Sequence, residues 1–476
     1  MQLGWLGIAL VMIPTILVLP AAVPMHVEPT ATPHAGTLGV PPQWGPNSTR
    51  IRHIITVVME NHDYDNFFGV YCQQLGPYCS NTGNGVPPGT CVPYNPANLS
   101  YGCIVPYNLT PAQFVVKDMQ HDWISGPQAW DDGKMDGFYA AEHDSVIPFG
   151  HYNGSTIPIY WDMAEEYTLG DNFYATNLSY SLPNHWDLVA GQAPAISSDS
   201  YIKTSSDRLT YRTESNATPT VEDLLNGTNV SWKYYDFGLI PMNLAYAGSP
   251  LGSAYDYWNP LAARGESYTS TYSGHLVPRT DFLTDIANGS LPDLSWVIPS
   301  APSSDHPGYN LTQGNSWVAQ LVDSVENSSY WNSTVIFVVW DDYGGWYDHV
   351  TPPLLPNTPI SFRSPILVIS PYAKENYISH AQLDFFSLLR YEEWQFSLPC
   401  MGALDCSATL PFDFFDFNQT ARPPILFATN WTQAHYPMPL QGFQPVVPLS
   451  CVSCTAVKPT SWETLTPYIP DPDLGD

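Results

Sequence analysis

IITVVMENHDYDNFFG, residues Ile54 to Gly69, joins a run of apolar and β-branched residues directly to a polar, aromatic-rich turn. The run is typical of a strand buried on both faces. Glu60 and Asn61 follow at its carboxyl end. An open α/β sheet keeps its chemistry at the carboxyl ends of its strands, and a carboxylate beside an amide offers oxygen ligands to a hard metal ion.

A second stretch, STVIFVVWDDYGGWYDH, repeats this design at residues Ser333 to His349. An apolar strand pattern ends at the adjacent carboxylates Asp341 and Asp342, and a glycine turn follows. The two strands together predict an oxygen-rich metal site in one crevice. Taken alone, the Asp pair is equally typical of a turn before two glycines.

The remaining periodicity predicts an α/β fold with a mostly parallel central sheet and helices on both faces. Short Val- and Ile-rich runs predict strands, and helical patterns lie between them. The predicted strands are Ile54–Met59, Thr334–Trp340 and Pro365–Ser370, and the predicted helices are Ile159–Tyr167, Ser316–Glu326 and Ala381–Trp394.

The chain of 476 residues divides by composition into four parts. Residues 1–23 contain an uncharged apolar run, Leu6 to Val23, which suits a signal peptide or an uncleaved amino-terminal anchor beside a membrane. Residues 24–49 are a Pro/Thr-rich linker, 50–430 the catalytic domain and 431–476 a Pro-rich tail. Within the domain, 197–290 has weak periodicity and is predicted to be an irregular insertion or lid.

Cysteines and glycosylation motifs point to an exported protein. An even number of cysteines in such a chain predicts disulfides, in insertions and in the tail, with zinc as the competing interpretation of the last CxxC. The cysteines are Cys72, Cys79, Cys91, Cys103, Cys400, Cys406, Cys451 and Cys454. Dense Asn-x-Ser/Thr motifs predict N-linked glycans. They begin at Asn47, Asn98, Asn108, Asn153, Asn177, Asn216, Asn226, Asn229, Asn288, Asn310, Asn327, Asn332, Asn418 and Asn430.

The net charge of −29 argues against nucleic-acid binding through a basic surface. Only 12% of residues are charged, about half the usual ~25%. The 15 Lys and Arg and 13 His would leave a modest positive charge once the carboxylates were protonated. This suggests an acidic working environment, with an ordinary acidic secreted protein as the alternative.

Five ordered blocks resemble the phosphoesterase family of bacterial phospholipases C and secreted acid phosphatases, which has an alkaline phosphatase-like fold. The blocks are MENHDYDNFFG, GDNFYATNLSYSLPNHWDLVAGQ, PDLSWVIPSAPSSDHP, VVWDDYGGWYDHVTPP and SPILVISPYAKENYISHAQLDFFSLLRYEE. They span about Arg52 to Ala421. The resemblance implies a phosphoric ester hydrolase.

The resemblance also implies roles for individual residues. Ser181 matches the family's nucleophile and metal ligand, and Glu60, Asn61, Asp341 and Asp342 match the other metal ligands. The family's polar positions around the phosphate match five further residues of this sequence. The histidines among them are expected to be catalytic, and Asn184, His185 and His306 are expected to bind substrate. That set is His121, Asn184, His185, His306 and His349. His380 matches a recurring position without an assigned role.

These residue types suit phosphoester hydrolysis through a phosphoserine. One divalent ion, which could be Ca, Mg, Mn, Fe or Zn, would lower the pKa of the serine hydroxyl, and protonated histidines would stabilise the phosphoryl charge. The family-like region ends near Ala421, without the β domains typical of the phospholipases, which favours an acid phosphatase. A phospholipase C is the first alternative, and a non-catalytic glycosylated surface protein on a hydrolase scaffold is the second.

Overall fold

The computed structural model describes residues 49–79, 82–110, 113–194, 210, 213–236, 258–264, 274–355 and 358–427. All of them belong to one compact unit within Gly39–Asp476. The predicted signal or anchor, the linker, the tail and the Cys451/Cys454 pair lie outside the described residues. Within these residues no helix is both long and apolar enough to cross a membrane.

A single large sheet organises the described residues, in the strand order β15-β6-β14-β11-β1-β10-β8-β9. Every neighbouring pair is parallel except the two that involve β14. In sheet order the strands are β15 (Tyr377–Ser379), β6 (Thr168–Gly170), β14 (Ile366–Ile369), β11 (Thr334–Trp340), β1 (His53–Met59), β10 (Leu294–Val297), β8 (Trp232–Asp236) and β9 (Leu276–Pro278). The predicted mostly parallel α/β fold is confirmed.

The two strands predicted from the opening motifs lie side by side at the centre of this sheet. Every residue of β11 is buried, as are all but the first of β1. Branched Val and Ile side chains fit such a strand because they pack on both faces of the pleat. The register pairs Met59 with Trp340, so the two strands end level with each other.

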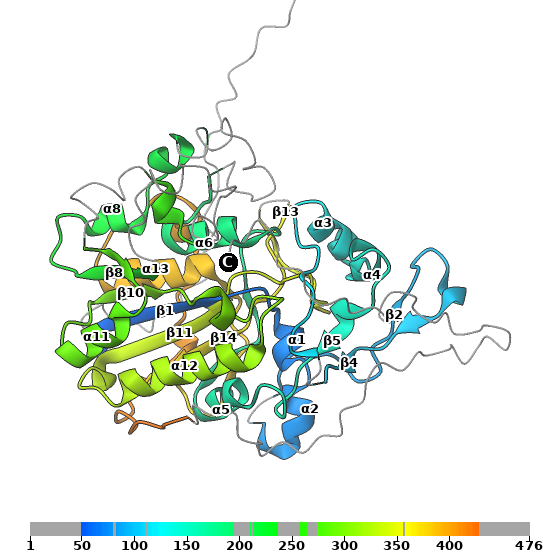
Figure 1. Ribbon diagram of the computed structural model, residues 1–476, viewed down its shortest axis with the longest axis horizontal. Coiled ribbons are helices and arrows are strands. Elements are labelled where there is room, and N and C mark those ends of the chain that lie inside the picture. The colour runs from blue at the N-terminus through cyan, green and yellow to red at the C-terminus, as the bar shows by residue number, and fades with distance from the viewer. Residues whose placement is uncertain are drawn as a thin grey trace, which may run out of the picture. The chain divides into compact units, whose positions relative to one another are not determined.

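Two groups of helices cover the opposite faces of the sheet (Figure 1). One group contains α5 (Pro158–Glu166), α11 (Asp281–Asn288) and α12 (Leu311–Glu326), and α12 contacts both of the others. The second group contains α6 (Ser181–Ala190), α8 (Val221–Leu225) and α13 (Phe385–Gln395), and α6 contacts both of the others. This double cover explains why the central strands have no polar face.

Short elements complete the described part of the chain. The helices are α1 (Tyr64–Phe68), α2 (Tyr71–Leu75), α3 (Ser125–Trp130) and α4 (Phe138–Ala141). The 3₁₀ turns are η1 (Gly76–Tyr78), η2 (Leu99–Tyr101), η4 (Asp131–Gly133), η5 (Ile147–Phe149), η6 (Pro260–Ala263), η8 (Ala301–Ser303), η9 (Trp331–Ser333), η10 (Leu404–Ser407) and η11 (Phe412–Phe414). The small strands are β2 (Val92–Pro93), β3 (Cys103–Ile104), β4 (Tyr107–Asn108), β5 (Gly150–His151), β7 (Phe173–Tyr174), β12 (Leu354–Leu355), β13 (Thr358–Pro359) and β16 (Leu383–Asp384).

The prediction of an irregular excursion over 197–290 missed regular structure. The described part of that region supplies β8 and β9 to the sheet and also contains α8 and α11. Its strand Trp232–Asp236 reads WKYYD, a polar and aromatic pattern without the Val/Ile signature of a buried parallel strand. Pairing with β10 and β9 determined its structure instead.

Disulfides form within the insertions, as the cysteine pattern predicts. Cys72 bonds to Cys79, Cys91 to Cys103 and Cys400 to Cys406. The described part of the chain contains no free cysteine.

Candidate active site

The ends of β1 and β11 bring the opening motifs into contact. The backbone N–H of Asp341 donates to the Met59 carbonyl at 2.9 Å, and the backbone N–H of Asn61 donates to Asp341 Oδ1 at 2.9 Å. Glu60, Asn61, Asp341 and Asp342 are all completely buried. The structure therefore brings these oxygen donors together, and strand register rather than long loops positions them; their role as metal ligands remains a prediction.

The two turns after these strands interlock through a glycine. Asn61 adopts the left-handed conformation with φ 58°, and Gly344 does the same with φ 58°. A Cβ atom at Gly344 would lie 2.1 Å from the Asn61 carbonyl oxygen, which no side chain can tolerate. The Gly344 N–H donates to Asp342 Oδ1 at 2.7 Å. Glycine is required here by both backbone conformation and space.

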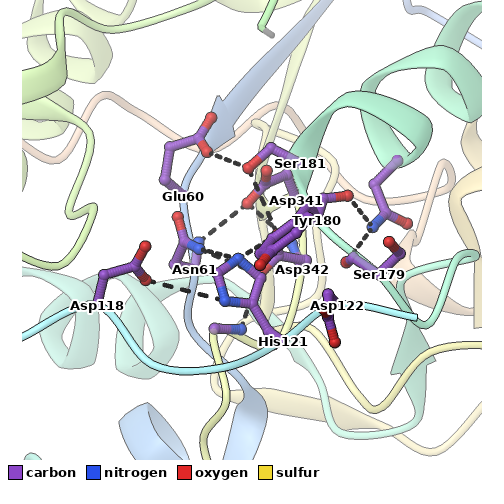
Figure 2. A network of polar contacts seen from close by, with 12 residues as sticks. Glu60, Asn61, Asp118, His121, Asp122, Ser179, Tyr180, Ser181, Asp341 and Asp342 are labelled. Atoms are coloured by element: carbon purple, nitrogen blue, oxygen red, sulfur yellow. Dashed lines mark hydrogen bonds and ion pairs between the residues drawn. The ribbon is translucent and has the colours of Figure 1, made fainter. Parts of the chain in front are cut away.

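Ser181 is the first residue of α6 and points into the same crevice (Figure 2). Its hydroxyl lies 3.0 Å from Glu60 Oε2 and 3.4 Å from Asp342 Oδ2. The amino end of a helix carries free N–H groups and a partial positive charge, which favour an anion at this position. The structure thus brings Ser181, at the start of a helix that covers the sheet, to the metal ligands predicted at the ends of the two central strands.

Asn184 lies behind Ser181, one turn along the helix, and is fully buried. Its Oδ1 accepts hydrogen bonds from the backbone N–H groups of Thr176 and Asn177, at 3.1 and 2.8 Å. Its Nδ2 donates to the carbonyls of Asn177, Ser179 and Tyr180. The Asn184 amide therefore holds the loop that leads into Ser181. This is a structural role and differs from the substrate contact expected from the sequence.

Two predicted histidines contact the carboxylates. His185 Nε2 lies 3.0 Å from Glu60 Oε1 and 3.5 Å from Asp341 Oδ2. His121 Nε2 lies 3.0 Å from Asn61 Nδ2 and 3.7 Å from Asp342 Oδ2. His121 Nδ1 contacts the Met119 carbonyl at 2.6 Å, so the neutral ring carries its proton on Nδ1 and Nε2 accepts from the Asn61 amide.

The cluster holds more negative than positive charge. Burial, followed by the charge of Asp341, raises the pKa of Glu60 well above its ordinary value. Burial also acts to raise the pKa of Asp341, but hydrogen bonding and attraction from His185 outweigh it and lower that pKa to about 2. The buried carboxylates therefore carry more negative charge than the neighbouring histidines can neutralise.

A divalent cation fits this donor set. Asn61 Oδ1 is buried without a hydrogen-bond partner, and Asp341 Oδ2 has only the long 3.5 Å contact with His185 Nε2, which is costly unless a cation is present. Ligand atoms of Glu60, His185 and Asp341 lie within 4.8 Å of one another. His185 thus joins the predicted ligands as a candidate. Its spacing of four from Ser181 on one helix face could have indicated this from sequence.

The other two predicted histidines lie on neighbouring loops. The segment before His306 contacts the Glu60 turn, because Glu60 N–H donates to the Ser304 carbonyl at 2.9 Å and His62 Nε2 lies 3.0 Å from the Asp305 carbonyl. His306 Nδ1 itself contacts the Pro307 carbonyl at 2.8 Å. Their catalytic roles remain predictions.

His349 belongs to a second buried cluster, which we call the arginine cluster: Asp65, Asp348, His349 and Arg363. Arg363 is fully buried and donates to Asp65 Oδ1 at 2.8 Å and to Asp348 Oδ1 at 2.6 Å. Asp65 Oδ2 in turn accepts from the backbone N–H of His349 at 2.8 Å and lies 2.6 Å from its Nδ1. Asp65 and Arg363 were not singled out from sequence, because neither follows a strand pattern that marks a site.

His380 pairs with Asp171 at 2.8 Å, and half of its side chain is exposed. The Asp171 carbonyl accepts from Arg363 Nη1 at 3.0 Å, so this pair adjoins the arginine cluster. His62 is a packed histidine. It stacks on Phe67 with a centroid distance of 4.2 Å, and burial lowers its pKa to about 4.

The sequence profile of the Phosphoesterase family matches residues 51–399, and this range contains both clusters and all the strands of the sheet. The chain belongs to the phosphoesterase family. As a member of this family it is a phosphoric ester hydrolase.

Similar phosphoesterases include phospholipase C A of Mycobacterium tuberculosis (strain CDC 1551 / Oshkosh), which is 26% identical over 455 residues, covering 84% of this chain and 82% of the relative. The non-hemolytic phospholipase C of Pseudomonas aeruginosa is 24% identical, over 80% of this chain and 59% of the relative. A solved protein of the alkaline phosphatase superfamily from Vibrio parahaemolyticus has a TM-score of 0.35 at 14% identity, covering 53% of this chain and 64% of that one. A TM-score of that size does not assign a fold.

Proposed function

We propose that this phosphoesterase hydrolyses phosphate monoesters as a metal-dependent acid phosphatase, through a phosphoserine at Ser181. One observation carries the proposal: the Ser181 hydroxyl lies at the start of a helix and 3.0 Å from Glu60, within a buried cluster of carboxylates short of positive charge. A serine in an inert core would not be surrounded by uncompensated acids, because burying them is costly.

In the first step Ser181 Oγ would bond to the phosphorus atom while the bond from phosphorus to the ester oxygen breaks. The hydroxyl proton would pass to Glu60 Oε2, which already accepts it at 3.0 Å. The leaving alcohol would take a proton from a protonated histidine, for which His121 and His306 are candidates. Free N–H groups at the start of α6 would stabilise the negative charge.

A divalent cation held by Glu60, Asn61, Ser181, Asp341 and Asp342, with His185 as a further candidate ligand, would lower the pKa of the serine hydroxyl and neutralise phosphoryl charge. In the second step water would attack phosphorus on the face opposite Ser181. The water would give a proton to the histidine that protonated the leaving alcohol, and the bond from phosphorus to Ser181 Oγ would break. Glu60 would return its proton to Ser181 Oγ, and inorganic phosphate would leave.

Acid conditions suit this set of residues because histidines, rather than arginines, surround the carboxylates. A histidine is cationic below its ordinary pKa of about 6.5 and can then both bind phosphate and donate a proton. The acidic composition of the chain supports the same working condition. We propose a secreted or surface location on the basis of the apolar amino-terminal run and the disulfides.

A phospholipase C is the second candidate. Two relatives named as phospholipases C favour it. So does the surface next to His121: Trp123 is 36% exposed and Ile124 is 74% exposed, directly after the histidine in sequence. Exposed apolar side chains beside a site can insert among lipid tails.

Rates on an aryl phosphate monoester and on phosphatidylcholine vesicles would separate the two candidates. An acid phosphatase would turn over the monoester faster, and activity would not rise when vesicles are added. Faster turnover of the vesicles, reduced by a Trp123→Ser and Ile124→Ser double variant, would favour the phospholipase. Absence of turnover on both, with bound metal demonstrated, would favour a non-catalytic scaffold.

A further inference from the structure

The structure separates the Asn-x-Ser/Thr motifs into two physical classes. Some asparagine side chains are exposed, and others are committed to interior hydrogen bonds. N-glycosylation attaches a bulky sugar to the amide nitrogen, so the asparagine must reach solvent and its Nδ2 must not be needed inside the protein. This criterion can be applied to each described motif.

Asn153 and Asn177 fail the criterion. Asn153 is fully buried, and its Nδ2 donates to Asn108 Oδ1 at 3.1 Å. Asn177 is partly buried, and its Nδ2 donates to Asp187 Oδ2 at 2.5 Å and to the Pro183 carbonyl at 3.2 Å. A sugar on either nitrogen would break these bonds, and at Asn177 it would disturb the loop that leads into Ser181.

Three exposed motifs gather at one place instead. Asn288 is the last residue of α11, Asn327 caps the carboxyl end of α12, and Asn332 lies in η9. The segments are tied together, because the Tyr330 hydroxyl accepts a hydrogen bond from the Leu291 N–H at 3.3 Å.

Open space is available at this place. A groove of about 640 Å³ lies between α11 and α12, and Asn327 lines it together with Leu283, Ile286, Gly289 and Ser329. The apolar ring face of a first sugar on Asn327 could lie against Leu283, which lines the same groove and is 38% exposed.

These motifs lie at the amino edge of the sheet. The Ile54 N–H at the start of β1 donates to the Asp293 carbonyl just before β10, and the Arg52 N–H donates to the Ser333 carbonyl just before β11. The catalytic residues follow the opposite ends of the same strands, with α11 beside the start of β1 and α1 beyond its end (Figure 1). Seven strand residues separate the two edges by roughly 20 Å.

We propose that Asn288, Asn327 and Asn332 are N-glycan attachment sites that cover the amino edge of the sheet, whereas Asn153 and Asn177 are unmodified in the folded protein. In each attachment the amide nitrogen bonds to C1 of the first sugar of a lipid-linked oligosaccharide, the bond from C1 to the lipid diphosphate breaks, and the amide loses one proton. The proposal does not depend on the substrate of the enzyme.

Site-resolved mass spectrometry of the full chain, secreted from a yeast host, tests this proposal. Glycan is expected on Asn288, Asn327 and Asn332, and each of the variants Asn288→Gln, Asn327→Gln and Asn332→Gln should lose the mass of one glycan. Asn177→Gln is the matched control, and its glycan mass should equal that of the wild type. Glycan on fewer than two of the three sites, or on Asn153 or Asn177 of the folded protein, would overturn the proposal.

The location of the glycans is tested separately on the folded wild-type protein, which avoids any loss of a variant during folding. Enzymatic removal of the glycans should change turnover of an aryl phosphate by less than twofold, because the sugars lie at the far edge. A tenfold or larger change would contradict the assignment to that edge.

Discussion

The carboxylate site around Ser181 and the arginine cluster around Arg363 are built from the same two loops and differ in one component. Both use acids that follow β1 and β11: Glu60 and Asp341 in the first, Asp65 and Asp348 in the second. Arg363 supplies a permanent cation to the second cluster, whereas the described residues supply the first only with histidines.

The consequence appears in the pKa values. Burial acts to raise the pKa of Asp65, but the charges of Arg363 and His349 outweigh it and lower that pKa below its ordinary value. Glu60 has no such partner, and burial beside Asp341 raises its pKa. The acids around Arg363 are therefore neutralised within the protein, whereas the acids around Ser181 lack a permanent cation, as the proposed metal site requires.

Removing the Ser181 hydroxyl tests the functional half of this comparison. Ser181→Ala is expected to lower kcat for an aryl phosphate by roughly 10⁴-fold or more, as loss of a nucleophile does in other hydrolases. Its melting temperature should stay near that of the wild type, because only one hydroxyl is lost. Turnover within tenfold of the wild type would remove Ser181 from its proposed role.

Metal removal tests whether the carboxylate site requires an external cation. Chelation and dialysis should lower activity by at least about 10²-fold, and adding back one divalent ion should restore it. The ion that restores activity should also raise the melting temperature of the wild type and leave that of Asp341→Asn nearly unchanged. Full activity in protein shown by elemental analysis to be metal-free would contradict the site.

Removing the charge of Arg363 tests the structural half of the comparison between the two clusters. Arg363→Met removes the permanent counter-charge of the buried Asp65 and Asp348, and breaking a buried pair in this way costs about 3–5 kcal/mol of unfolding free energy. Urea unfolding measures the loss. Lys134→Met is the matched control: its ion pair with Asp131 is exposed, so the loss of unfolding free energy should be much smaller. Equal effects of the two variants would refute the comparison.

Among the described residues, a third class of buried acid forms no ion pair and has no proposed ligand. Burial raises the pKa of Asp187 to about 7 and that of Glu222 to about 8. A carboxyl group with a raised pKa in the folded state contributes stability that is complete below its unfolded pKa of about 4. That stability is lost as the pH rises through 7 to 8.

The smallest expected effect is on the pH dependence of stability. The urea concentration at the midpoint of unfolding should be higher at pH 5 than at pH 8.5. Glu222→Gln should reduce this difference, because the amide cannot ionise. Glu375→Gln, at a position whose side chain is 68% exposed, serves as the control and should leave the difference unchanged. A midpoint that rises between pH 5 and pH 8.5 would also argue against the acidic working environment.

The features that could be predicted from the sequence are those that depend on local residue patterns. Glu60 and Asp341 could be placed at strand ends because both strands carry an unbroken apolar signal, whereas Ser181 was placed by family resemblance alone. The structural role of Asn184 could not be anticipated, since its hydrogen bonds to the preceding loop leave no periodic trace. The polar and aromatic strand β8 was missed because its neighbours, not its own residues, determine its conformation.

The level ends of β1 and β11, with Met59 opposite Trp340, also limit how the chain length can vary in evolution or engineering. A single inserted or deleted residue in either strand would move its ligands by about 3.3 Å and turn every later side chain to the other face. An insertion or deletion can be tolerated only at positions that follow the predicted metal ligands in the chain. The disulfide-bonded excursion around Cys72–Cys79 and Cys91–Cys103 begins just beyond the first ligand turn, which makes it the natural place to add or remove sequence without altering the chemistry.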